Sequence, residues 1–380
     1  MKTIHLSLAE VTEVEEECVL RALRSGWVTP LGPEVDAFEA EVAQRVGVKH
    51  ALALNSGTAA LHLALLGVGA QPGAAVLVPS MTFASTANAV SYTGAEPVFV
   101  DSDPADGNVD PHLMLEAADA LHREGVPVVA AVPVDLFGRC VDYGTLAPGL
   151  EQRRIALIED AAEALGASRE GTKAGAFGKA AALSFNGNKI MTTSGGGIML
   201  SDDEEFVKRA RYLSTQARQP VAWYEHTDIG YNYRMSNLLA ALGRGQLSRL
   251  DSMITRRREI RDRYAAGLAD LDGIRIIGRG MEPDDSTDNC WLTSVVLDQE
   301  LIPNGIDPVL AVLSENQIEA RHLWKPMHAQ PVFAKNRSFV TGASDDLFAR
   351  GLNLPSGSGL TDADIDRVVG ALRTALGASA

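Results

Sequence analysis

Apolar positions near the start of the chain recur at helical spacing. Within residues 10–25 the apolar stripe consists of Val14, Cys18 and Ala22. Gly26 follows at the position where helices commonly end. A second stripe begins at Pro33, a residue favoured in the first turn of a helix, and consists of Val35, Phe38, Val42 and Val46. The pattern predicts two amphipathic helices before residue 50.

From residue 50 onward, short apolar or β-branched runs alternate with helical stretches. Runs that are apolar throughout are typical of strands buried on both faces of a parallel sheet. The predicted strands span residues 50–54, 75–79, 97–100, 126–134, 155–159, 180–185 and 197–200. The alternation predicts an α/β fold with a mostly parallel central sheet.

A long helical segment follows Ser236 and extends through residues 238–268. It is interpreted as the connector out of the main domain. Beyond about residue 270, shorter strands and helices and a polar loop at 282–289 predict a smaller C-terminal α/β domain. We therefore expect a large domain at residues 1–250, which includes an N-terminal arm, and a small domain at residues 251–380.

Composition narrows the possible partners. The chain carries 34 Lys and Arg against 49 Asp and Glu, which gives a formal net charge of −15. Nucleic acid and anionic membranes are held mainly by clustered basic residues, so neither is expected as a partner. The acidic start and the lack of a long apolar stretch predict a cytoplasmic protein. Cys18, Cys140 and Cys290 are too widely spaced for a zinc motif, and no metal site is predicted.

Two segments place polar residues where strands end. In residues 50–66 a strand runs into Asn-Ser-Gly-Thr and a helix follows, which predicts either a phosphate site or only a helix N-cap. In residues 153–167 a strand ends at Glu159 and Asp160. A carboxylate there lies at the edge where α/β sheets bind ligands, although an acidic pair is equally common at a solvated helix start.

A third segment, residues 179–200, presents Lys189 in a polar loop before a run of three glycines. A lone loop lysine is commonly a solvated charge, but glycines that permit close backbone approach also fit a reactive amine. Pyridoxal phosphate requires a lysine that holds it covalently, a carboxylate that keeps its ring nitrogen protonated, and a phosphate site. The order of these features along the chain resembles the fold-type I aminotransferases.

Five longer blocks narrow this resemblance and together span nearly the whole chain. They lie at residues 21–39, 55–65, 78–90, 159–167 and 230–243. On these blocks the chain resembles the DegT/DnrJ/StrS family of pyridoxal-phosphate sugar aminotransferases. Residues 184–197 and 323–333 are most similar to the PglE and EpsN subgroup, which is associated with UDP-linked 4-keto-6-deoxy-N-acetylhexosamines, as in bacillosamine synthesis.

The resemblance implies a role for each matching position. Lys189 and Asp160 are implied as the catalytic residues, with Lys189 holding the cofactor and moving protons and Asp160 pairing with the pyridinium nitrogen. Further cofactor contacts are implied for Gly57, Thr58, Ala59, Phe83, Glu163, Ser184 and Asn232. Substrate contacts are expected at Trp324, Lys325 and His328. Asn232 is implied to serve the neighbouring subunit, so the expected assembly is a homodimer with shared active sites.

Several of these positions have structural alternatives. Phe83 could equally be an aromatic side chain of the core. Asn232 could be a turn residue before the helix near residue 236, and Lys325 could cap the end of a strand. Many family members have Gln or His at the position of Glu163, and in those proteins the Gln or His side chain contacts the cofactor's ring oxygen. Two carboxylates near one ring would repel each other if both were ionised, which leaves the protonation state of Glu163 open.

The implied reaction transfers an amino group from L-glutamate to a nucleotide-linked keto-sugar, a UDP-4-keto-6-deoxy-N-acetylhexosamine by subgroup resemblance. The alternatives are a dTDP-4-keto-6-deoxyhexose aminotransferase and a non-catalytic cofactor-binding regulatory protein. A regulatory protein without turnover would be expected to have lost its catalytic residues, yet Lys189 and Asp160 are present. Both implied ligands are anions, whereas the chain has a net charge of −15. We therefore expect backbone amides to bind the cofactor phosphate and a few local cations to bind the diphosphate. The candidate cations are Lys325 and Arg234.

Overall fold

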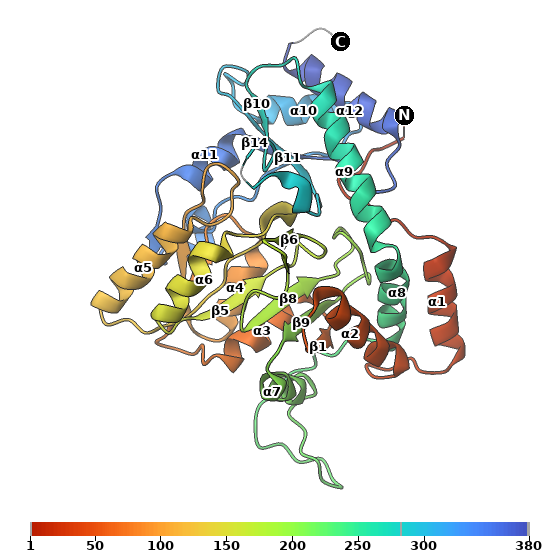
Figure 1. Ribbon diagram of the computed structural model, residues 1–380, viewed down its shortest axis with the longest axis vertical. Coiled ribbons are helices and arrows are strands. Elements are labelled where there is room, and N and C mark those ends of the chain that lie inside the picture. The colour runs from red at the N-terminus through yellow and green to blue at the C-terminus, as the bar shows by residue number, and fades with distance from the viewer. Residues whose placement is uncertain (1, 282, 378–380) are drawn as a thin grey trace.

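Two main sheets organise the protein. The computed structural model describes residues 2–281 and 283–377. Within them, an eight-stranded sheet forms the body of the molecule and a four-stranded sheet lies near the C-terminus (Figure 1). A short pairing also joins β6 (Ser168–Arg169) to β7 (Thr172–Lys173).

The large sheet has the strand order β1-β9-β8-β5-β4-β2-β3-β13. Its strands are β1 (His50–Leu54), β2 (Ala75–Pro79), β3 (Glu96–Val100), β4 (Val128–Ala131), β5 (Ala156–Asp160), β8 (Ala180–Ser184), β9 (Gly197–Ser201) and β13 (Ser338–Phe339). All neighbouring strands are parallel except for the two pairings of β9. The prediction of a mostly parallel α/β sheet is confirmed, although β4 is shorter than the predicted run at 126–134.

Helices cover both faces of this sheet. One face packs against α2 (Pro33–Val46), α5 (Pro111–Arg123) and α6 (Tyr143–Gln152), and the other against α3 (Gly57–Gly67), α4 (Ala84–Tyr92) and α7 (Glu204–Ser214). Successive strand residues therefore enter different cores: Leu77 belongs to the first and Val78 to the second. Burial on both faces explains why these strands are apolar throughout.

The second sheet is antiparallel and has its own core. It consists of β10 (Ile274–Ile276), β11 (Thr293–Leu297), β12 (Arg321–His322) and β14 (Gly351–Leu354). Its core is completed by α9 (Leu250–Gly267), α10 (Asp307–Glu315) and α12 (Asp362–Ala375). The remaining elements of this half are α11 (Ala343–Arg350) and the 3-10 turns η2 (Asp285–Thr287), η3 (Met327–Ala329) and η4 (Pro331–Phe333).

The predicted N-terminal helices are both present. The first, α1 (Glu13–Arg24), begins at a Thr12–Glu15 capping box and ends before Gly26, whose φ is 80°. Every member of the predicted α2 stripe is buried, whereas Ala22 is the buried member of the α1 stripe. The predicted connector is interrupted: α8 (Asn237–Ser248) and α9 meet at Arg249, which pairs with Glu15 at 2.9 Å. Among the described helices, none has both the length and the apolar surface needed to cross a bilayer.

The chain passes between the two sheets more than once. Ile4 bridges Ile318 and packs in the C-terminal core, while β13 returns to pair with β3 of the large sheet. The division at residue 250 therefore stays a prediction. These crossings bring the segment around 323–343 back to the body of the molecule, where the candidate site lies.

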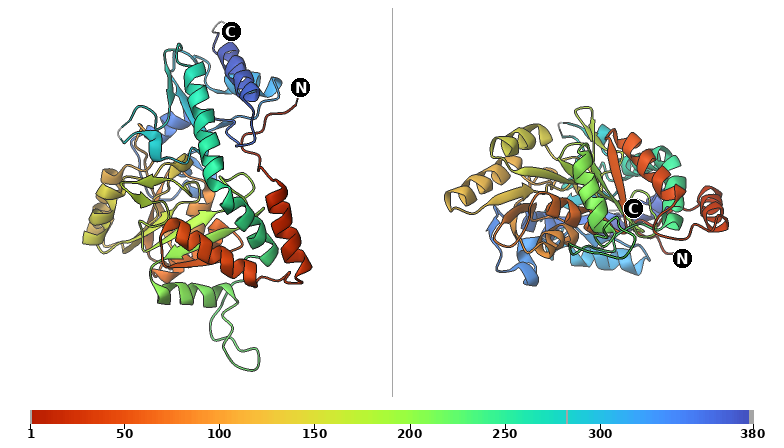
Figure 2. Two further views of the ribbon diagram at one scale, coloured as in Figure 1. Left: turned by 45° about the vertical axis from the view of Figure 1, so that its right-hand side comes forward. Right: turned by 90° about the horizontal axis from the view of Figure 1, so that it is seen from below.

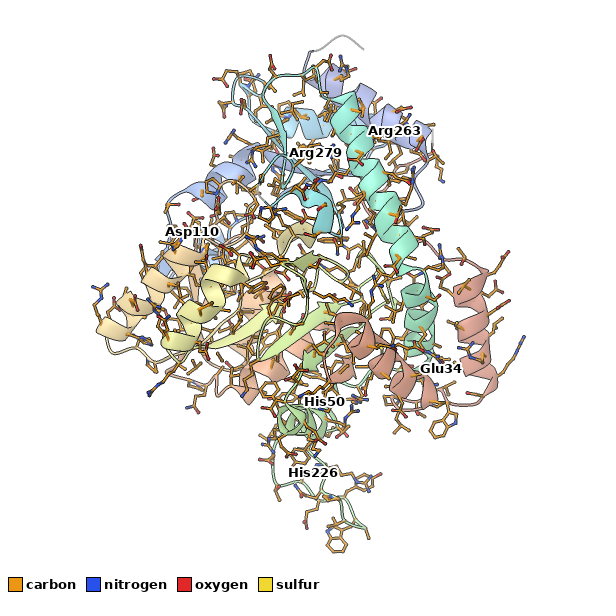
Figure 3. The ribbon with its side chains drawn as sticks, in the orientation of Figure 1. Glu34, His50, Asp110, His226, Arg263 and Arg279 are labelled. Atoms are coloured by element: carbon orange, nitrogen blue, oxygen red, sulfur yellow. The ribbon has the colours of Figure 1, made fainter. Side chains whose placement is uncertain are left out.

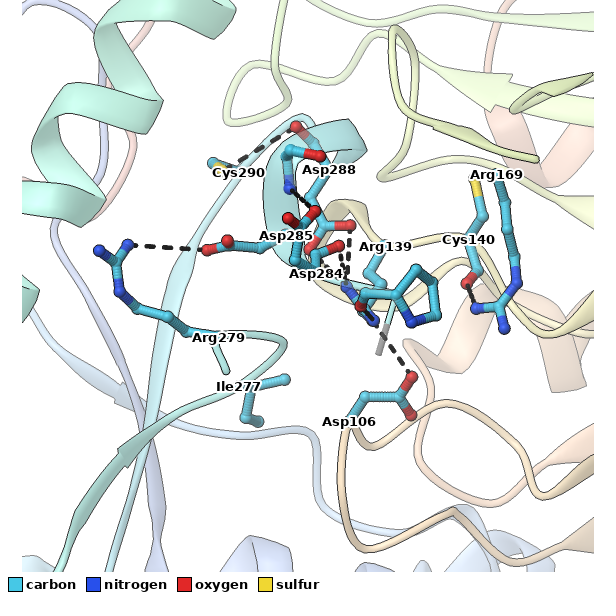
Figure 4. Close-up of polar contacts among 12 residues, drawn as sticks. Asp106, Arg139, Cys140, Arg169, Ile277, Arg279, Asp284, Asp285, Asp288 and Cys290 are labelled. Atoms are coloured by element: carbon cyan, nitrogen blue, oxygen red, sulfur yellow. Dashed lines mark hydrogen bonds and ion pairs between the residues drawn. The ribbon is translucent and has the colours of Figure 1, made fainter. Parts of the chain in front are cut away.

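The polar run predicted as a loop at 282–289 joins the two halves through buried charges. Residue 282 lies outside the described residues. Arg139, which follows η1 (Leu136–Gly138), contacts Asp106 at 3.3 Å and Asp288 at 3.2 Å (Figure 4). Arg261 on α9 pairs with Asp285 at 3.0 Å. Apart from the turn η2, the described residues of this run form no helix or strand, in agreement with the predicted loop. Asp288 and Asn289 at its end are buried, so the end of the loop is a buried junction with paired charges.

One segment projects from the body. Residues 215–235, between α7 and α8, extend below the large sheet as a long hairpin-like excursion (Figure 2). His226 marks its position among the drawn side chains (Figure 3). Trp223, Tyr224 and Ile229 on this segment are exposed, Ile229 to 89%. Large apolar side chains gathered and exposed on one segment are typical of interaction surfaces.

Candidate active site

A cavity of about 310 Å³ lies where β5 and β8 end and α3 begins. It brings together most of the residues predicted from the sequence, which are Gly57, Thr58, Phe83, Asp160, Glu163, Ser184, Lys189 and Trp324. This position, at the carboxyl ends of parallel strands, is where open α/β sheets bind ligands.

The start of α3 forms one wall of the cavity. Ser56 is the N-cap, and its hydroxyl accepts a hydrogen bond from the N–H of Ala59 at 3.0 Å. The N–H groups of Gly57 and Thr58 precede any acceptor inside the helix, so they are available to an anion. Ala59 is not among the residues that line the cavity, and its N–H already serves the cap.

Close backbone packing explains the glycines at this wall. A Cβ at Gly197 would lie 2.3 Å from the Gly57 nitrogen, and a Cβ at Gly57 would lie 3.1 Å from the Ser184 Cβ. The start of β9 therefore reaches the start of α3 only because Gly197 lacks a side chain, and Gly57 permits the close approach of the end of β8. This packing places the Ser184 hydroxyl at the same cavity wall as Gly57 and Thr58.

Asp160 is the acid of the site. It is 2% exposed at the end of β5, accepts a hydrogen bond from the Thr86 hydroxyl at 2.7 Å and another from the Ala162 N–H at 3.2 Å. Burial raises the pKa of Asp160, and the hydrogen bonds from Thr86 and Ala162 and then the charge of Lys189 oppose that rise. A cation brought against this carboxylate would stabilise its ionised form further.

Lys189 reaches the centre of the cavity with little exposure to solvent. Its Nζ lies 3.4 Å from Glu163 Oε1 and 4.1 Å from the centroid of the Trp291 ring. The amine is thus held between a carboxylate and an aromatic face. Trp291, which is 1% exposed, was not predicted as a site residue: it lies far from Lys189 in the sequence, and its surroundings carry no recognisable motif.

The junction between the two halves fixes Trp291. The Asn289 amide donates to the carbonyl oxygens of Glu163 at 2.8 Å and Leu165 at 3.0 Å, and its oxygen accepts from the Trp291 N–H at 2.8 Å. The Trp291 indole donates to the carbonyl of Asn188 at 2.7 Å. One segment of the C-terminal half therefore orients both neighbours of the lysine.

Glu163 is buried and has two polar partners. Besides Lys189, it accepts a hydrogen bond from the Phe137 N–H at 2.8 Å. Burial raises the pKa of Glu163, the Lys189 charge and the Phe137 hydrogen bond lower it, and the negative charge of Asp160 raises it. The repulsion expected between the two carboxylates is thus present but is reduced by the lysine.

Phe83 and Trp324 line the cavity, and Phe137 packs against Trp324. Phe83 meets Trp324 edge-on at 5.5 Å between ring centroids, and Phe137 stacks on Trp324 at 6.2 Å. Phe83 is 53% exposed, so the alternative of a core aromatic does not hold for it. Phe137 adopts the uncommon φ of 55°, and its N–H donates to Glu163 at 2.8 Å.

Four other predicted positions lie away from the cavity wall. Lys325 is exposed beside Trp324, and Asn232 is exposed on the projecting segment. His328 is held by the Ser80 hydroxyl at 2.6 Å and Asp345 at 3.2 Å. The Arg234 side chain is 8% exposed and pairs with Glu39 at 3.0 Å. Its guanidinium is thus engaged by a carboxylate, and a role at the diphosphate stays a prediction.

A reactive lysine, a buried acid and a free helix N-terminus that converge in one cavity define the site of a fold-type I pyridoxal-phosphate enzyme. The chain belongs to the DegT/DnrJ/EryC1/StrS aminotransferase family, whose model matches residues 9–373. The family resemblance and the fold class expected from the sequence are confirmed.

Relatives cover almost the whole chain. EpsN of Bacillus subtilis (strain 168), provisionally described as a pyridoxal phosphate-dependent aminotransferase, is 42% identical over 374 residues, which cover 97% of this chain and 94% of EpsN. GDP-perosamine synthase of Caulobacter vibrioides is 37% identical over 364 residues, which cover 94% of each protein. The crystal structure of DesI with its TDP-sugar product matches with a TM-score of 0.88 at 30% identity, covering 99% of this chain and 93% of that one.

These findings make the protein a pyridoxal-phosphate-dependent sugar aminotransferase, which takes a sugar substrate and an amino donor. The cofactor predicted from the sequence is confirmed. The alternative of a regulatory protein without turnover is set aside, because the family is one of enzymes and Lys189 and Asp160 meet in one intact cavity.

Proposed function

We propose that the enzyme transfers an amino group from L-glutamate to a nucleotide-linked keto-sugar, specifically a UDP-4-keto-6-deoxy-N-acetylhexosamine, as in bacillosamine-type or exopolysaccharide sugar synthesis. The observation that carries the reaction type is the meeting of Lys189, Asp160 and the α3 N-terminus in one cavity. The nucleotide and sugar are supported by the similarity to EpsN and by the subgroup motifs at 184–197 and 323–333.

The residues present fit the cofactor. The N–H groups of Gly57 and Thr58 and the Ser184 hydroxyl would hydrogen-bond to the cofactor phosphate. Asp160 would pair with the ring nitrogen, and the Lys189 amine would bind the aldehyde. When bound, pyridoxal phosphate supplies a carbonyl for amine exchange and a ring that withdraws electrons. The phosphate site uses backbone amides, which explains how a chain with a net charge of −15 holds an anion there.

The side chains around the cofactor site have separate roles in the proposed reaction. Lys189 would hold the cofactor through its amine and, when that amine is free, would carry the transferred proton on Nζ. Asp160, kept in place by Thr86, stabilises a protonated ring nitrogen through its charge. Glu163 and Trp291 confine the Lys189 amine, so it remains close to the reacting centre. The aromatic group of Phe83, Phe137 and Trp324 limits water access from the outer side.

Trp324 supports the proposed substrate side of the site. Its indole nitrogen is buried, yet it has no hydrogen-bond partner among the described residues. A buried donor of this kind is costly unless a ligand satisfies it. Lys325 is exposed next to it and is the cation proposed to meet the diphosphate, whereas His328 is proposed to act by holding this turn in place.

We predict that Trp324→Phe weakens sugar-nucleotide binding and leaves the reaction with the amino donor unchanged. Phenylalanine keeps the ring contacts but removes the N–H, so KM for the sugar nucleotide should rise about 5- to 50-fold, as expected for one hydrogen bond to a charged or polar ligand group. Steady-state kinetics with each substrate varied in turn make the measurement. An unchanged KM would contradict a substrate contact by the indole.

The nucleotide is tested by comparing UDP- and dTDP-linked 4-keto sugars with glutamate and following 2-oxoglutarate. We expect a higher kcat/KM for the UDP-linked N-acetylated sugars than for the dTDP-linked sugars. The second candidate, a dTDP-4-keto-6-deoxyhexose substrate, is favoured by the match to DesI, whose structure contains a TDP-sugar product. A preference for the dTDP series would establish that candidate and reject the UDP assignment.

The homodimer with shared active sites is also part of this proposal. Apolar side chains are exposed on α1 and the turn after it, at Leu23, Trp27, Val28 and Leu31, and again on the projecting segment at Trp223, Tyr224 and Ile229. Asn232, implied to reach the partner's cofactor phosphate, lies exposed at the base of that segment. Exposed apolar groups at both places support an interface that includes the segment.

We predict that two inactive variants, Lys189→Ala and Asn232→Ala, regain activity when mixed and refolded or co-expressed. A mixed dimer would contain one site with an intact Lys189 and an intact Asn232, so about a quarter of wild-type activity should return after random exchange. Each variant alone is the control. Failure of the mixture to exceed its components, although mixed dimers form, would contradict sharing of Asn232.

A further inference from the structure

The N-terminal arm, which is the segment before α1, contacts the loop that carries Lys189 between β8 and β9. The Ser7 hydroxyl of this arm donates to the carbonyl of Asn188 at 2.8 Å. The same carbonyl accepts the indole N–H of Trp291 at 2.7 Å. Asn188 lines the cavity and directly precedes Lys189. Two donors from distant parts of the chain therefore meet at the peptide group that joins Asn188 to Lys189.

Backbone hydrogen bonds fix the arm immediately before Ser7. The N–H of Leu6 donates to the Glu319 carboxylate at 3.2 Å, and the carbonyl of Leu6 accepts the N–H of Ser356 at 2.8 Å. Ser7 itself is 9% exposed. The arm is thus bound to the C-terminal half at this point, and its next side chain is directed to the lysine loop.

Arg257 on α9 holds both of the residues that donate to Asn188. Its Nη1 donates to the carbonyl of Trp291 at 2.6 Å and to the carbonyl of Ser356 at 2.9 Å. Its Nη2 donates to the Ser7 hydroxyl at 3.2 Å. The Ser7 hydroxyl accepts from Arg257 and donates to Asn188, so its hydrogen is directed to the loop.

The Arg257 guanidinium is a buried charge that forms no ion pair within the described part of the chain. It is 2% exposed, and its Nε has no acceptor among the described residues. Burial lowers the pKa of Arg257 to about 10, so the group stays charged at neutral pH. A buried cation that is held by neutral oxygens alone is costly. This cost indicates that the contacts of Arg257 serve the site and not only stability.

We propose that Ser7 is a positioning residue for Lys189, because its hydroxyl and the Trp291 indole together hold the Asn188 carbonyl and with it the lysine loop. Arg257 fixes both donors. The role rests on the proposed function of Lys189 and is independent of the nucleotide and the sugar. Failure of the lysine assignment is recognised separately, by an active Lys189→Ala enzyme.

Ser7→Ala should loosen the lysine loop and slow the reaction. The Lys189 N–H donates to the Asn186 carbonyl at 3.0 Å, so its hydrogen exchange reports opening of the loop. With one hydrogen bond lost, this exchange should be about fivefold faster in the full-length, cofactor-loaded enzyme. The amine is then in place for a smaller fraction of the time, so the rate constant of the half-reaction with L-glutamate should fall about 3- to 10-fold. Mass spectrometry measures the exchange, and cofactor absorbance measures the rate.

Ser358→Ala is the matched control. The Ser358 hydroxyl donates to Glu10 at 2.6 Å, so it also joins the arm to the C-terminal half, but it has no hydrogen bond to the lysine loop among the described residues. Both alanine variants should lower the melting temperature by about 1–3 °C. Only Ser7→Ala should change the exchange at Lys189 and the rate. Equal changes in the two variants would overturn the proposal, as would wild-type exchange and rate in Ser7→Ala.

The shared carbonyl allows a second test with a double variant. Trp291→Phe keeps an aromatic ring but removes the indole N–H, and in the combination with Ser7→Ala the Asn188 carbonyl loses both donors. The rate constant of the double variant should therefore fall by more than the product of the two single losses. A loss equal to that product or smaller would show that the donors do not act through one carbonyl and would overturn the proposal. If Trp291→Phe does not fold, the comparison of Ser7→Ala with Ser358→Ala decides the outcome.

Discussion

Lys189→Ala should abolish turnover and the covalent attachment of the cofactor together. The variant removes the amine that holds the cofactor and also moves the proton, so kcat should fall by a factor of about 10⁴ or more. Treatment of the wild-type enzyme with borohydride should leave the cofactor fixed to the peptide that contains Lys189, as detected by mass spectrometry. The variant should show no such adduct.

Two controls separate chemistry from charge. Lys189→Arg keeps a cation near Glu163 and Trp291 but cannot hold the cofactor covalently, so it should be as inactive as the alanine variant. Lys208→Ala removes an exposed lysine of α7 that pairs with Glu204 and Glu205, and it should retain wild-type activity. An active Lys189→Ala enzyme would contradict the assignment of the lysine.

Asp160→Asn should produce the second largest effect, on both cofactor affinity and rate. Removing one partner of a buried ion pair costs about 3–5 kcal/mol, so the Kd for pyridoxal phosphate should rise by at least about 100-fold. A ring nitrogen without its carboxylate also loses its preference for the protonated form, so kcat should fall even when the cofactor is saturating. Absorbance titration gives the Kd, and turnover at saturating cofactor gives kcat.

Thr86→Val provides a graded comparison for this prediction. It removes the hydroxyl that donates to Asp160 Oδ2 at 2.7 Å but leaves the charge in place. The expected loss is about 1 kcal/mol, or less than tenfold in affinity. A cofactor affinity in Asp160→Asn that equals that of wild type would show that the carboxylate does not face the ring nitrogen.

The sequence predicted the features that depend on local pattern. Strands such as β2 and β8 are buried on both faces, so their apolar runs identify them directly. Asp160 and Lys189 follow such strands, and their place at the strand ends determines that they face the same cavity. Helix α2 was recognisable because its whole apolar stripe is buried.

Other features depend on contacts between distant segments, which no local pattern records. Trp291 contacts Lys189 only because Asn289 attaches the junction to the Glu163 carbonyl. The polar run at 282–289 was predicted as a loop, but its composition did not reveal that Asp288 at its end is buried against Arg139. Likewise, Arg234 carries a cation suited to a phosphate, and only the fold reveals Glu39 beside it.

The proposed transfer of an amino nitrogen from glutamate to a nucleotide-linked keto-sugar is tested most directly with ¹⁵N-labelled L-glutamate and a UDP-4-keto-6-deoxy-N-acetylhexosamine. The sugar nucleotide is recovered and analysed by mass spectrometry. We predict that the wild-type enzyme yields a UDP-linked amino sugar that carries the label, with 2-oxoglutarate formed in equal amount, and that Lys189→Ala yields none. A sugar nucleotide recovered without labelled nitrogen from active, cofactor-loaded enzyme would contradict the account.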